Sequence, residues 1–220
     1  MNGWSHQGSF HMNRRHATIA IAALCAAGPF RALAGSPVEG KEFTALRDAQ
    51  PATIPGKIEV VEFFSYACPA CNAFDPALEQ WRTTLPPDVG FRRVPVPYLD
   101  NAENFQRTYF ALEATGMLAS VHGKVFAAVH VEKRRLAKPD EIADVVARAG
   151  GDRAKFLAAF SSFSVSSFVA RAKASTSAHH VESIPALAVA GRFLTSPRQA
   201  GSPQEALAVA AFLVDKARKG

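Results

Sequence analysis

The clearest pattern in the chain is an apolar run that passes into a helical repeat. Residues 57–65 (KIEVVEFFS) carry β-branched and aromatic side chains on both alternating faces, which is typical of a strand inside a sheet. Glu62 interrupts this run. Further along, apolar residues recur at helical spacing at Phe74, Ala77, Leu78, Trp81 and Leu85. The pattern predicts a buried strand, a short turn and a helix with one apolar stripe.

Two later segments complete the expected sheet. Residues 89–98 (VGFRRVPVPY) predict a strand whose prolines favour an edge position or an early end. Residues 184–196 (IPALAVAGRFLTS) predict a hairpin that turns at the Ala190-Gly191 pair. Ser202 and Glu205 then form a capping-box start for a final amphipathic helix that runs to about Lys219.

A block of helical patterns separates these strands. It runs from residue 102 to about residue 174, and Asp152 and Ser164 are expected to cap its last two helices. The order of elements predicts one α/β domain whose central sheet is interrupted by an all-helical insertion. The expected boundaries are 35–98 and 178–220 for the sheet domain and 99–177 for the insertion.

The first 34 residues have the organisation of a secretory signal peptide. A basic pair at 14–15 precedes an apolar segment at 17–27, and small residues at 32 and 34 mark a cleavage site before Gly35. About eleven apolar residues are too few to cross a bilayer as a helix, so a permanent membrane anchor is the weaker interpretation. We therefore expect an exported protein. Met12 is an alternative translation start.

Composition and charge narrow the function classes. The chain is 48% hydrophobic and 20% charged, as expected of a soluble domain with a sizeable core. Loss of residues 1–34 removes three arginines, no acid and Cys25, which leaves a formal charge of +3. So small an excess, without a basic stripe interleaved with aromatic residues, argues against a nucleic-acid partner. The exported chain retains only Cys68 and Cys71, in a compartment where disulfides persist.

These two cysteines form a Cys-x-x-Cys pair at the start of the predicted helix. Pro69 suits the first helical position because its missing N–H has no partner there, which places Cys68 at or beside the N-cap. Free N–H groups and the positive end of the helix dipole favour an anion, so Cys68 should ionise more readily than an ordinary thiol. The spacing predicts an exposed, reactive sulfur at Cys68 and a shielded, resolving one at Cys71.

Two other interpretations of the pair remain open. As a staple, a bridge that closes a four-residue loop would contribute only about 2 kcal/mol, less than a long-range bridge. As half of a zinc site, the pair would need further ligands, for which His179 and His180 are the candidates. The chain has no second Cys-x-x-Cys, and adjacent histidines in a polar loop are more often solvated. We therefore favour redox chemistry and expect no metal or cofactor besides a Cys68–Cys71 disulfide.

The run VEFFSYACPACNAFDPALEQW (61–81), with the later SIPALAVAGRF (183–193), resembles the DsbA family of exported thiol:disulfide oxidants, a branch of the thioredoxin superfamily. The resemblance covers nearly all of the exported chain and implies a thioredoxin-like fold with an inserted helical subdomain. It implies that Glu62 is the family's acid in the strand before the cysteines. It also implies that Pro185, after Ile184, is the cis-proline that faces the disulfide.

The resemblance assigns the site residues. Catalytic roles fall to Cys68, Cys71, Glu62 and Pro185, and substrate contacts to Pro69, Ala70 and Ile184. Each match keeps a plainer alternative, since Glu62 would also suit a partly exposed strand end and Pro185 an ordinary trans proline that opens a strand. Phe64 and Tyr66 are expected to line the core or a groove without a catalytic role.

Ala70 departs from the best-known family members, which carry histidine at this position. A helix terminus contributes about 0.3 to 1 kcal/mol, up to about 2, and one pKa unit corresponds to about 1.36 kcal/mol. The dipole alone therefore lowers the pKa of the thiol by about one unit, whereas members of the family reach far larger depressions. We expect Ala70 to make Cys68 less acidic and the protein a milder oxidant.

The resemblance implies a monomeric oxidoreductase that donates its disulfide to reduced or unfolded exported proteins. A membrane thiol oxidase of the DsbB type would then reoxidise the pair. A disulfide isomerase or reductase of the same superfamily is the nearest alternative. Isomerases usually carry an N-terminal dimerisation region, however, and only the 22 residues from Gly35 to Gly56 precede the first predicted strand. A metal-binding or chaperone-like peptide-binding protein is the alternative from another class.

Overall fold

The computed structural model describes residues 35–220 and places the predicted first strand inside a five-stranded mixed sheet. Strand β2 (Ile58–Phe64) runs parallel to β3 (Val89–Pro95) and antiparallel to β4 (Ala186–Val189). The hairpin continues into β5 (Phe193–Thr195), which pairs with the short β1 (Thr44–Ala45) to give the order β1-β5-β4-β2-β3. The proline-containing β3 lies at the edge, as its sequence predicts.

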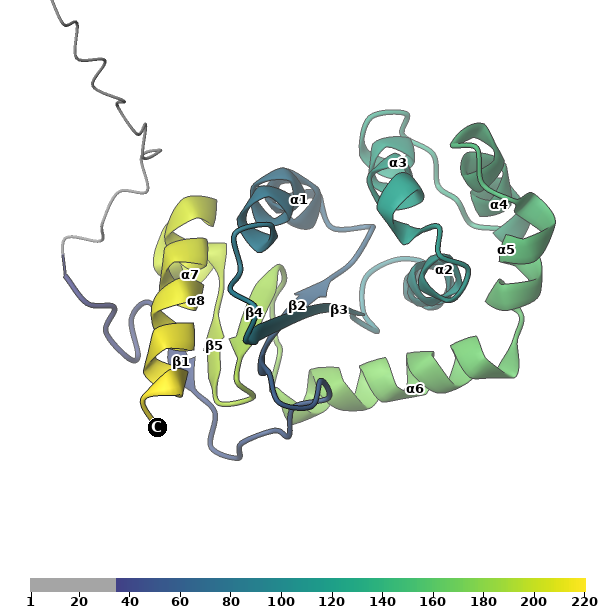
Figure 1. Ribbon diagram of the computed structural model, residues 1–220. Coiled ribbons are helices and arrows are strands. Elements are labelled where there is room, and N and C mark those ends of the chain that lie inside the picture. The colour runs from purple at the N-terminus through teal and green to yellow at the C-terminus, as the bar shows by residue number, and fades with distance from the viewer. Residues whose placement is uncertain (1–34) are drawn as a thin grey trace, which may run out of the picture. The chain divides into compact units, whose positions relative to one another are not determined.

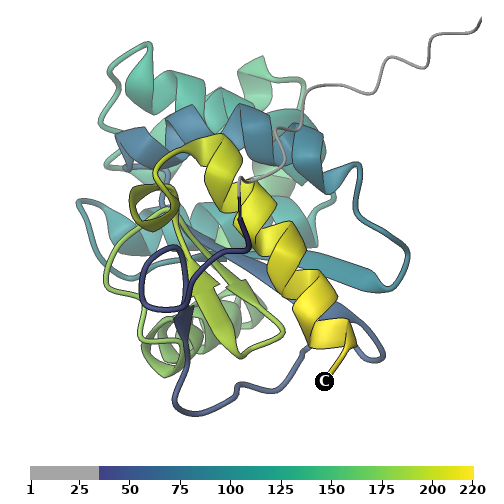
Figure 2. The ribbon, with the colours of Figure 1, turned by 90° about the vertical axis from the view of Figure 1, so that its left-hand side faces the viewer.

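Helices cover both faces of this sheet. On one face lie α1 (Pro69–Arg82), the short α7 (Pro197–Ala200) and α8 (Pro203–Arg218), and α6 (Phe163–Ala178) lies on the other (Figure 1). Figure 2 shows α8 crossing in front of the strands. Because side chains alternate along β2, Val60 packs with α1 and α8 whereas Val61 packs into a second core with α6.

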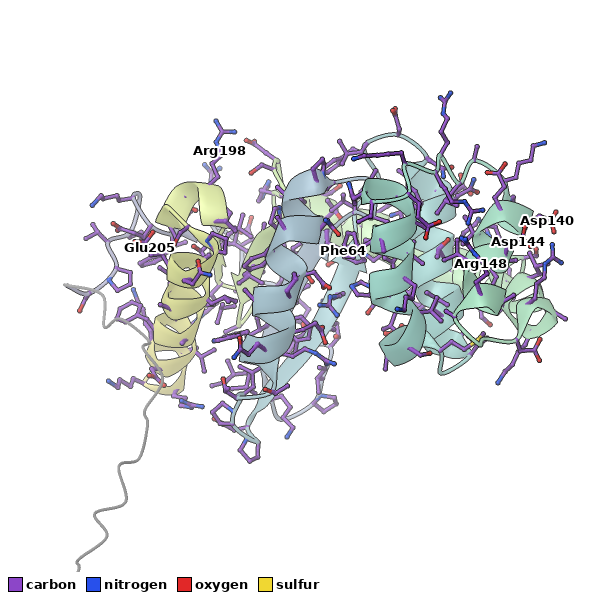
Figure 3. The ribbon with its side chains drawn as sticks, turned by 90° about the horizontal axis from the view of Figure 1, so that it is seen from above. Phe64, Asp140, Asp144, Arg148, Arg198 and Glu205 are labelled. Carbon is purple, nitrogen blue, oxygen red and sulfur yellow. The ribbon has the colours of Figure 1, made fainter. Side chains whose placement is uncertain are left out.

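The helical insertion follows β3. It consists of α2 (Ala102–Ala114), α3 (Leu118–His130), α4 (Pro139–Arg148), α5 (Arg153–Phe160) and α6, which leads back to the sheet. Figure 3 shows Phe64 between α1 and the insertion, with Asp140, Asp144 and Arg148 at the far end of the insertion. The predicted α/β fold class with a helical insertion is confirmed, and the proposed subdomain boundaries stay a prediction.

The structure tests the N-cap residues that the sequence predicts. Asp152 and Ser202 accept from the main-chain N–H groups of Lys155 and Glu205, so both residues are the predicted N-caps. The return bond from the Ser202 N–H to the Glu205 side chain, which the predicted capping box requires, is not formed. The prediction for Ser164 is wrong, because Ser162 caps α6 by accepting from Val165 at 3.2 Å. Ser161, Ser162 and Ser164 lie at or near the start of this helix, and the local sequence does not distinguish which of them has the extended backbone that a cap requires.

Two small elements were not predicted at all, namely β1 and α7. Neither is longer than four residues, too short for a hydrophobic period to emerge. The predicted signal peptide, the alternative start at Met12 and Cys25 lie outside the described residues. Among residues 35–220, no helix has the length and apolarity needed to cross a membrane.

Candidate active site

Cys68 is the N-cap residue of α1. Its backbone is extended (φ −86°, ψ 115°), Pro69 occupies the first helical position, and the main-chain N–H of Cys71 donates to the Cys68 Sγ at 3.2 Å. The main-chain N–H of Cys68 in turn donates to the Ser65 carbonyl at 3.1 Å. The sulfur therefore takes the place that a serine or aspartate oxygen fills at an ordinary N-cap.

The sulfur of Cys68 is less accessible than the spacing suggested. Cys71 is fully buried, as predicted, but Cys68 is only 6% exposed, so the expectation of an exposed sulfur there is wrong. Segments distant in sequence cover it: the Ile184 carbonyl lies 3.8 Å from its sulfur. A partner must therefore approach Cys68 along a restricted path beside Ile184.

The two thiols differ sharply in acidity. The pKa of Cys68 is lowered to about 6, chiefly by the hydrogen bond from the Cys71 side chain and further by the main-chain N–H groups of Cys71 and Ala70, against the effect of burial. The pKa of Cys71 is raised, first by burial and then by the hydrogen bond and charge of Cys68. At neutral pH the reduced pair therefore consists of a Cys68 thiolate and a Cys71 thiol.

The residues that are predicted to contact the substrate, together with Pro185, lie next to the cysteines in the sequence or beside Cys68 in the structure. The Ile184–Pro185 peptide bond is cis, Pro185 is buried, and Ile184 is partly exposed. Pro69 and Ala70 are exposed at the start of α1. An approaching peptide would therefore meet apolar side chains around Cys68 and the main chain of Ile184.

Glu62 lies beneath the cysteines in a buried ion pair. It is 1% exposed, and the Arg93 Nε donates to its carboxylate at 2.6 Å. Burial, partly offset by the charge and hydrogen bond of Arg93, raises the pKa of Glu62 to about 7. The charge of Glu62 is also one of the factors that raise the pKa of Cys71. The plainer alternative of a partly exposed strand end is wrong.

Sequence reasoning missed the groups around Glu62. Arg93 also donates to Asp75 at 2.9 Å and to Glu79 at 2.7 Å, and His122 contacts Asp75 at 3.2 Å. Glu62 stands opposite Arg93 in the β2–β3 register, and this pairing follows from the parallel alignment alone. Asp75 and Glu79 lie four residues apart on one face of α1, a weak signal for a shared partner.

Tyr98 is a second residue that the sequence did not reveal. It is half-buried in the segment after β3, and its hydroxyl donates to the Val181 carbonyl at 3.4 Å. Burial, followed by the charges of Cys71 and Cys68, raises the pKa of Tyr98 to about 12. Its hydroxyl therefore stays protonated near the cysteine pair.

The two histidines considered as metal ligands have different environments. His180 is exposed, but His179 is 4% exposed, packs against Phe63 and is bonded through Nδ1 to the Ser175 carbonyl at 2.8 Å. The expectation of a solvated pair is therefore wrong for His179. Within residues 35–220, no three metal-binding side chains lie close enough together to hold an ion. Phe64 and Tyr66 are fully buried in the core.

The structure has a mixed sheet and a Cys-x-x-Cys pair at a helix N-terminus, with one thiol acidic, the other not, and the cis Ile184–Pro185 peptide bond beside Cys68. These features define a thiol:disulfide oxidoreductase of the thioredoxin type. Comparison with known proteins gives the same class. The sequence model described as "DSBA-like thioredoxin domain" matches residues 87–202, which include Pro185 and begin after Cys71.

Relatives and solved structures extend the match over most of the chain. The thiol:disulfide interchange protein DsbA of Pseudomonas aeruginosa is 38% identical over 81% of this chain and 85% of its own length. That of Bordetella parapertussis is 39% identical over 91% and 96%, respectively. The crystal structure of P. aeruginosa DsbA has a TM-score of 0.79 and 38% identity, and covers 82% of this chain and 94% of that one. This chain belongs to the DsbA-like thioredoxin family.

Proposed function

We propose that this enzyme is a periplasmic oxidant that donates the Cys68–Cys71 disulfide to reduced proteins arriving from the cytoplasm. The observation that carries the proposal is the separation of the two thiols, with the pKa of Cys68 at about 6 and that of Cys71 raised. A stabilised Cys68 thiolate is a good leaving group and favours the reduced form of the protein. Electrons therefore flow from substrate thiols to this disulfide.

The proposed reaction has two exchange steps. A substrate thiolate attacks the Cys68 sulfur, the substrate–Cys68 disulfide forms, and the Cys68–Cys71 bond breaks with Cys71 as the leaving thiolate. A second substrate thiolate then attacks the substrate sulfur of the mixed disulfide, which forms the substrate disulfide and releases the Cys68 thiolate. Two electrons pass from the substrate dithiol to the protein disulfide.

The other site residues are proposed to transfer protons and to contact the substrate. Cys71 leaves as a buried anion that must gain a proton, and Glu62, with a pKa of about 7, is the proposed proton source and later the acceptor. The main chain at Ile184 and Pro185 is proposed to pair with an extended substrate segment. Pro69 and Ala70, exposed beside Cys68, are proposed to contact the same segment.

Export and partners complete the proposal. Residues 1–34 would be removed as a signal peptide between Ala34 and Gly35, and a membrane thiol oxidase of the DsbB type would reoxidise the pair. Residues 35–98 and 178–220 would form the thioredoxin-like domain around the insertion 99–177, in a monomer. The N-terminal sequence of protein recovered from the periplasm tests the cleavage site.

A transfer assay with a redox titration tests the function. Oxidised protein is mixed with reduced, unfolded ribonuclease, and thiols of both proteins are counted over time. We expect about one substrate disulfide per protein disulfide and none with Cys68→Ser. Titration of the Cys68–Cys71 couple against glutathione should give an oxidising potential.

Other outcomes identify the alternatives. A strongly reducing couple would reverse the direction and indicate a reductase, whereas faster repair of scrambled ribonuclease without net oxidation would indicate an isomerase. Metal retained at purification and lost in Cys68→Ser would indicate a metal-binding protein. Binding of unfolded ribonuclease without any thiol exchange would indicate a peptide-binding chaperone.

A further inference from the structure

Three carboxylates share one buried guanidinium beneath the cysteines. Arg93 contacts Glu62 at 2.6 Å, Asp75 at 2.9 Å and Glu79 at 2.7 Å, and its side chain is 6% exposed. We call Glu62, Asp75 and Glu79 the carboxylate cluster. A single shared positive charge does not compensate three negative charges, of which those of Glu62 and Asp75 are largely buried, so one member of the cluster tends to hold a proton.

His122 brings the helical insertion into this cluster. It lies on α3, is 5% exposed, and bridges two residues of the sheet domain. Its Nε2 lies 3.2 Å from the Asp75 carboxylate, and its Nδ1 lies 2.7 Å from the Tyr66 hydroxyl. Aromatic rings enclose the imidazole and hold its orientation: Phe64, Tyr66, Tyr109 and Phe126.

The partners of His122 determine where its proton lies. Burial lowers the pKa of His122 despite the hydrogen bond to Asp75, so the ring is neutral at pH 7 and carries one proton. Burial raises the pKa of Tyr66, whose hydroxyl stays protonated and donates to Nδ1. The proton of His122 is therefore on Nε2, where it is donated to Asp75.

Each carboxylate of the cluster has a different second partner. Glu79 is more exposed than the others and also binds Arg82 at 2.9 Å. Asp75 has the Nε2–H of His122 as its second donor. Glu62 has Arg93 as its only hydrogen-bonding partner within the described chain. We propose that His122 is a positioning residue: by donating to Asp75, it keeps the proton of the carboxylate cluster on Glu62.

This inference rests on the proposed function only in the role that it gives the proton of Glu62. The titratable and charged groups that face Glu62 come from the elements packed around it, namely β3, α1, α2 and the turn before α1: Arg93, Cys71, Asp75, Glu79, Tyr109 and Tyr66. On β4, the residue paired with Glu62 is the uncharged Leu187. His122 acts on this set through Asp75.

An NMR titration of the full exported chain in its reduced state tests the inference. Glutamate is labelled with ¹³C at the side-chain carboxyl, and Glu62→Gln assigns the Glu62 signal. In His122→Phe, Asp75 loses its second donor and takes up the proton more readily, so the midpoint of Glu62 should fall by about one pH unit. His122→Gln, which retains an N–H near the Nε2 position, should leave the midpoint in place.

Two further variants keep the outcome decisive. His179→Phe replaces another buried histidine, one that does not touch the cluster, and should leave Glu62 unchanged. In an Asp75→Asn background, replacing His122 should no longer move the Glu62 midpoint, and His122→Leu takes the place of His122→Phe in both backgrounds if His122→Phe does not fold. A Glu62 midpoint that is unchanged or raised in His122→Phe, or that moves equally in both backgrounds, would overturn the inference.

The titration is measured without turnover, so it separates this inference from the proposed function. If the Glu62 midpoint moves as expected in His122→Phe but the protein transfers no disulfide, the positioning role of His122 is supported and the proposed function is refuted. If the protein transfers its disulfide but the Glu62 midpoint does not move, the proposed function is supported and the positioning role is refuted. When both hold, the pH profile of disulfide transfer should shift with the Glu62 midpoint.

Discussion

The main-chain N–H of Cys71 points at the sulfur of Cys68, 3.2 Å away within the first turn of α1. The Cys71 side chain donates to the same sulfur and is the largest contribution to the low pKa of Cys68. The resolving cysteine thus stabilises the thiolate that forms when the disulfide is reduced. Burial raises the pKa of Cys71, and the same interaction raises it further.

Removal of the Cys71 donor should make Cys68 less acidic. We expect Cys71→Ala to raise the pKa of Cys68 from about 6 toward the value of a free cysteine, because the main-chain N–H groups alone remain. Cys71→Ser, which keeps a hydroxyl donor, should raise it less. Thiolate absorbance at 240 nm against pH measures both variants, and equal values for the two would contradict this explanation.

Histidine at position 70 should make the site a stronger oxidant. Ala70 is exposed beside Cys68, so Ala70→His adds a group that donates and carries positive charge next to the thiolate. The pKa of Cys68 should fall below about 6, and the glutathione equilibrium should shift toward the reduced protein. An Ala70→Gln variant controls for size, and an unchanged ultraviolet titration in Ala70→His would refute the prediction.

Glu62 should make stability depend on pH in a direction opposite to that of an ordinary carboxylate. The pKa of Glu62 is about 4.3 in an unfolded chain and about 7 in the folded one. Its contribution to the free energy of unfolding is therefore complete below about pH 4.3 and lost as the pH rises through 7. Urea denaturation in a Cys68→Ser/Cys71→Ser background avoids thiol titration. We subtract the unfolding free energy of the same protein with Glu62→Gln from that of this background. We expect this difference to decrease as the pH rises from about 4.5 to about 7.5.

Arg93 should be among the most sensitive positions in the domain. Arg93→Met leaves three carboxylates without their shared cation and should cost about 3 to 5 kcal/mol of unfolding free energy at pH 7. Arg82→Met removes a partner of Glu79 that is 42% exposed and should cost less than about 1 kcal/mol. Part of the Arg93→Met loss should be recovered at pH 5, where the cluster takes up protons. A pH-independent loss would show that packing, not charge, dominates.

Gly191 should not tolerate a side chain. It has a φ of +60° in the β4–β5 turn, and an added Cβ would lie 1.9 Å from the Gln50 carbonyl oxygen. Gly191→Ala should cost about 2 to 4 kcal/mol, from left-handed strain plus displacement of the main chain. Gly116→Ala has a similar φ of +72° but open space, and should cost only about 1 to 2 kcal/mol. Thermal unfolding of the two variants separates the clash from the strain.

Local patterns were enough for much of the fold. The strand at Ile58–Phe64, the helix that begins at Pro69, the turn at Ala190-Gly191 and the caps at Asp152 and Ser202 all follow from residues a few positions apart. Ser164 shows the limit of this reasoning, since the true cap is Ser162. Neighbouring residues of the same type have the same local propensity, and the packing of the helix selects between them.

The site divides in the same way. The sequence alone determined the pair of cysteines, the place of Cys68 at a helix N-terminus and the helical periodicity that buries Cys71. These features are local because capping and amphipathicity act within one or two helical turns. The tertiary structure alone brought the Ile184 carbonyl against Cys68, aligned Arg93 with Glu62 and inserted His122 from the helical block. These contacts join segments 31 to 116 residues apart, and strand register and helix packing set them rather than any local preference.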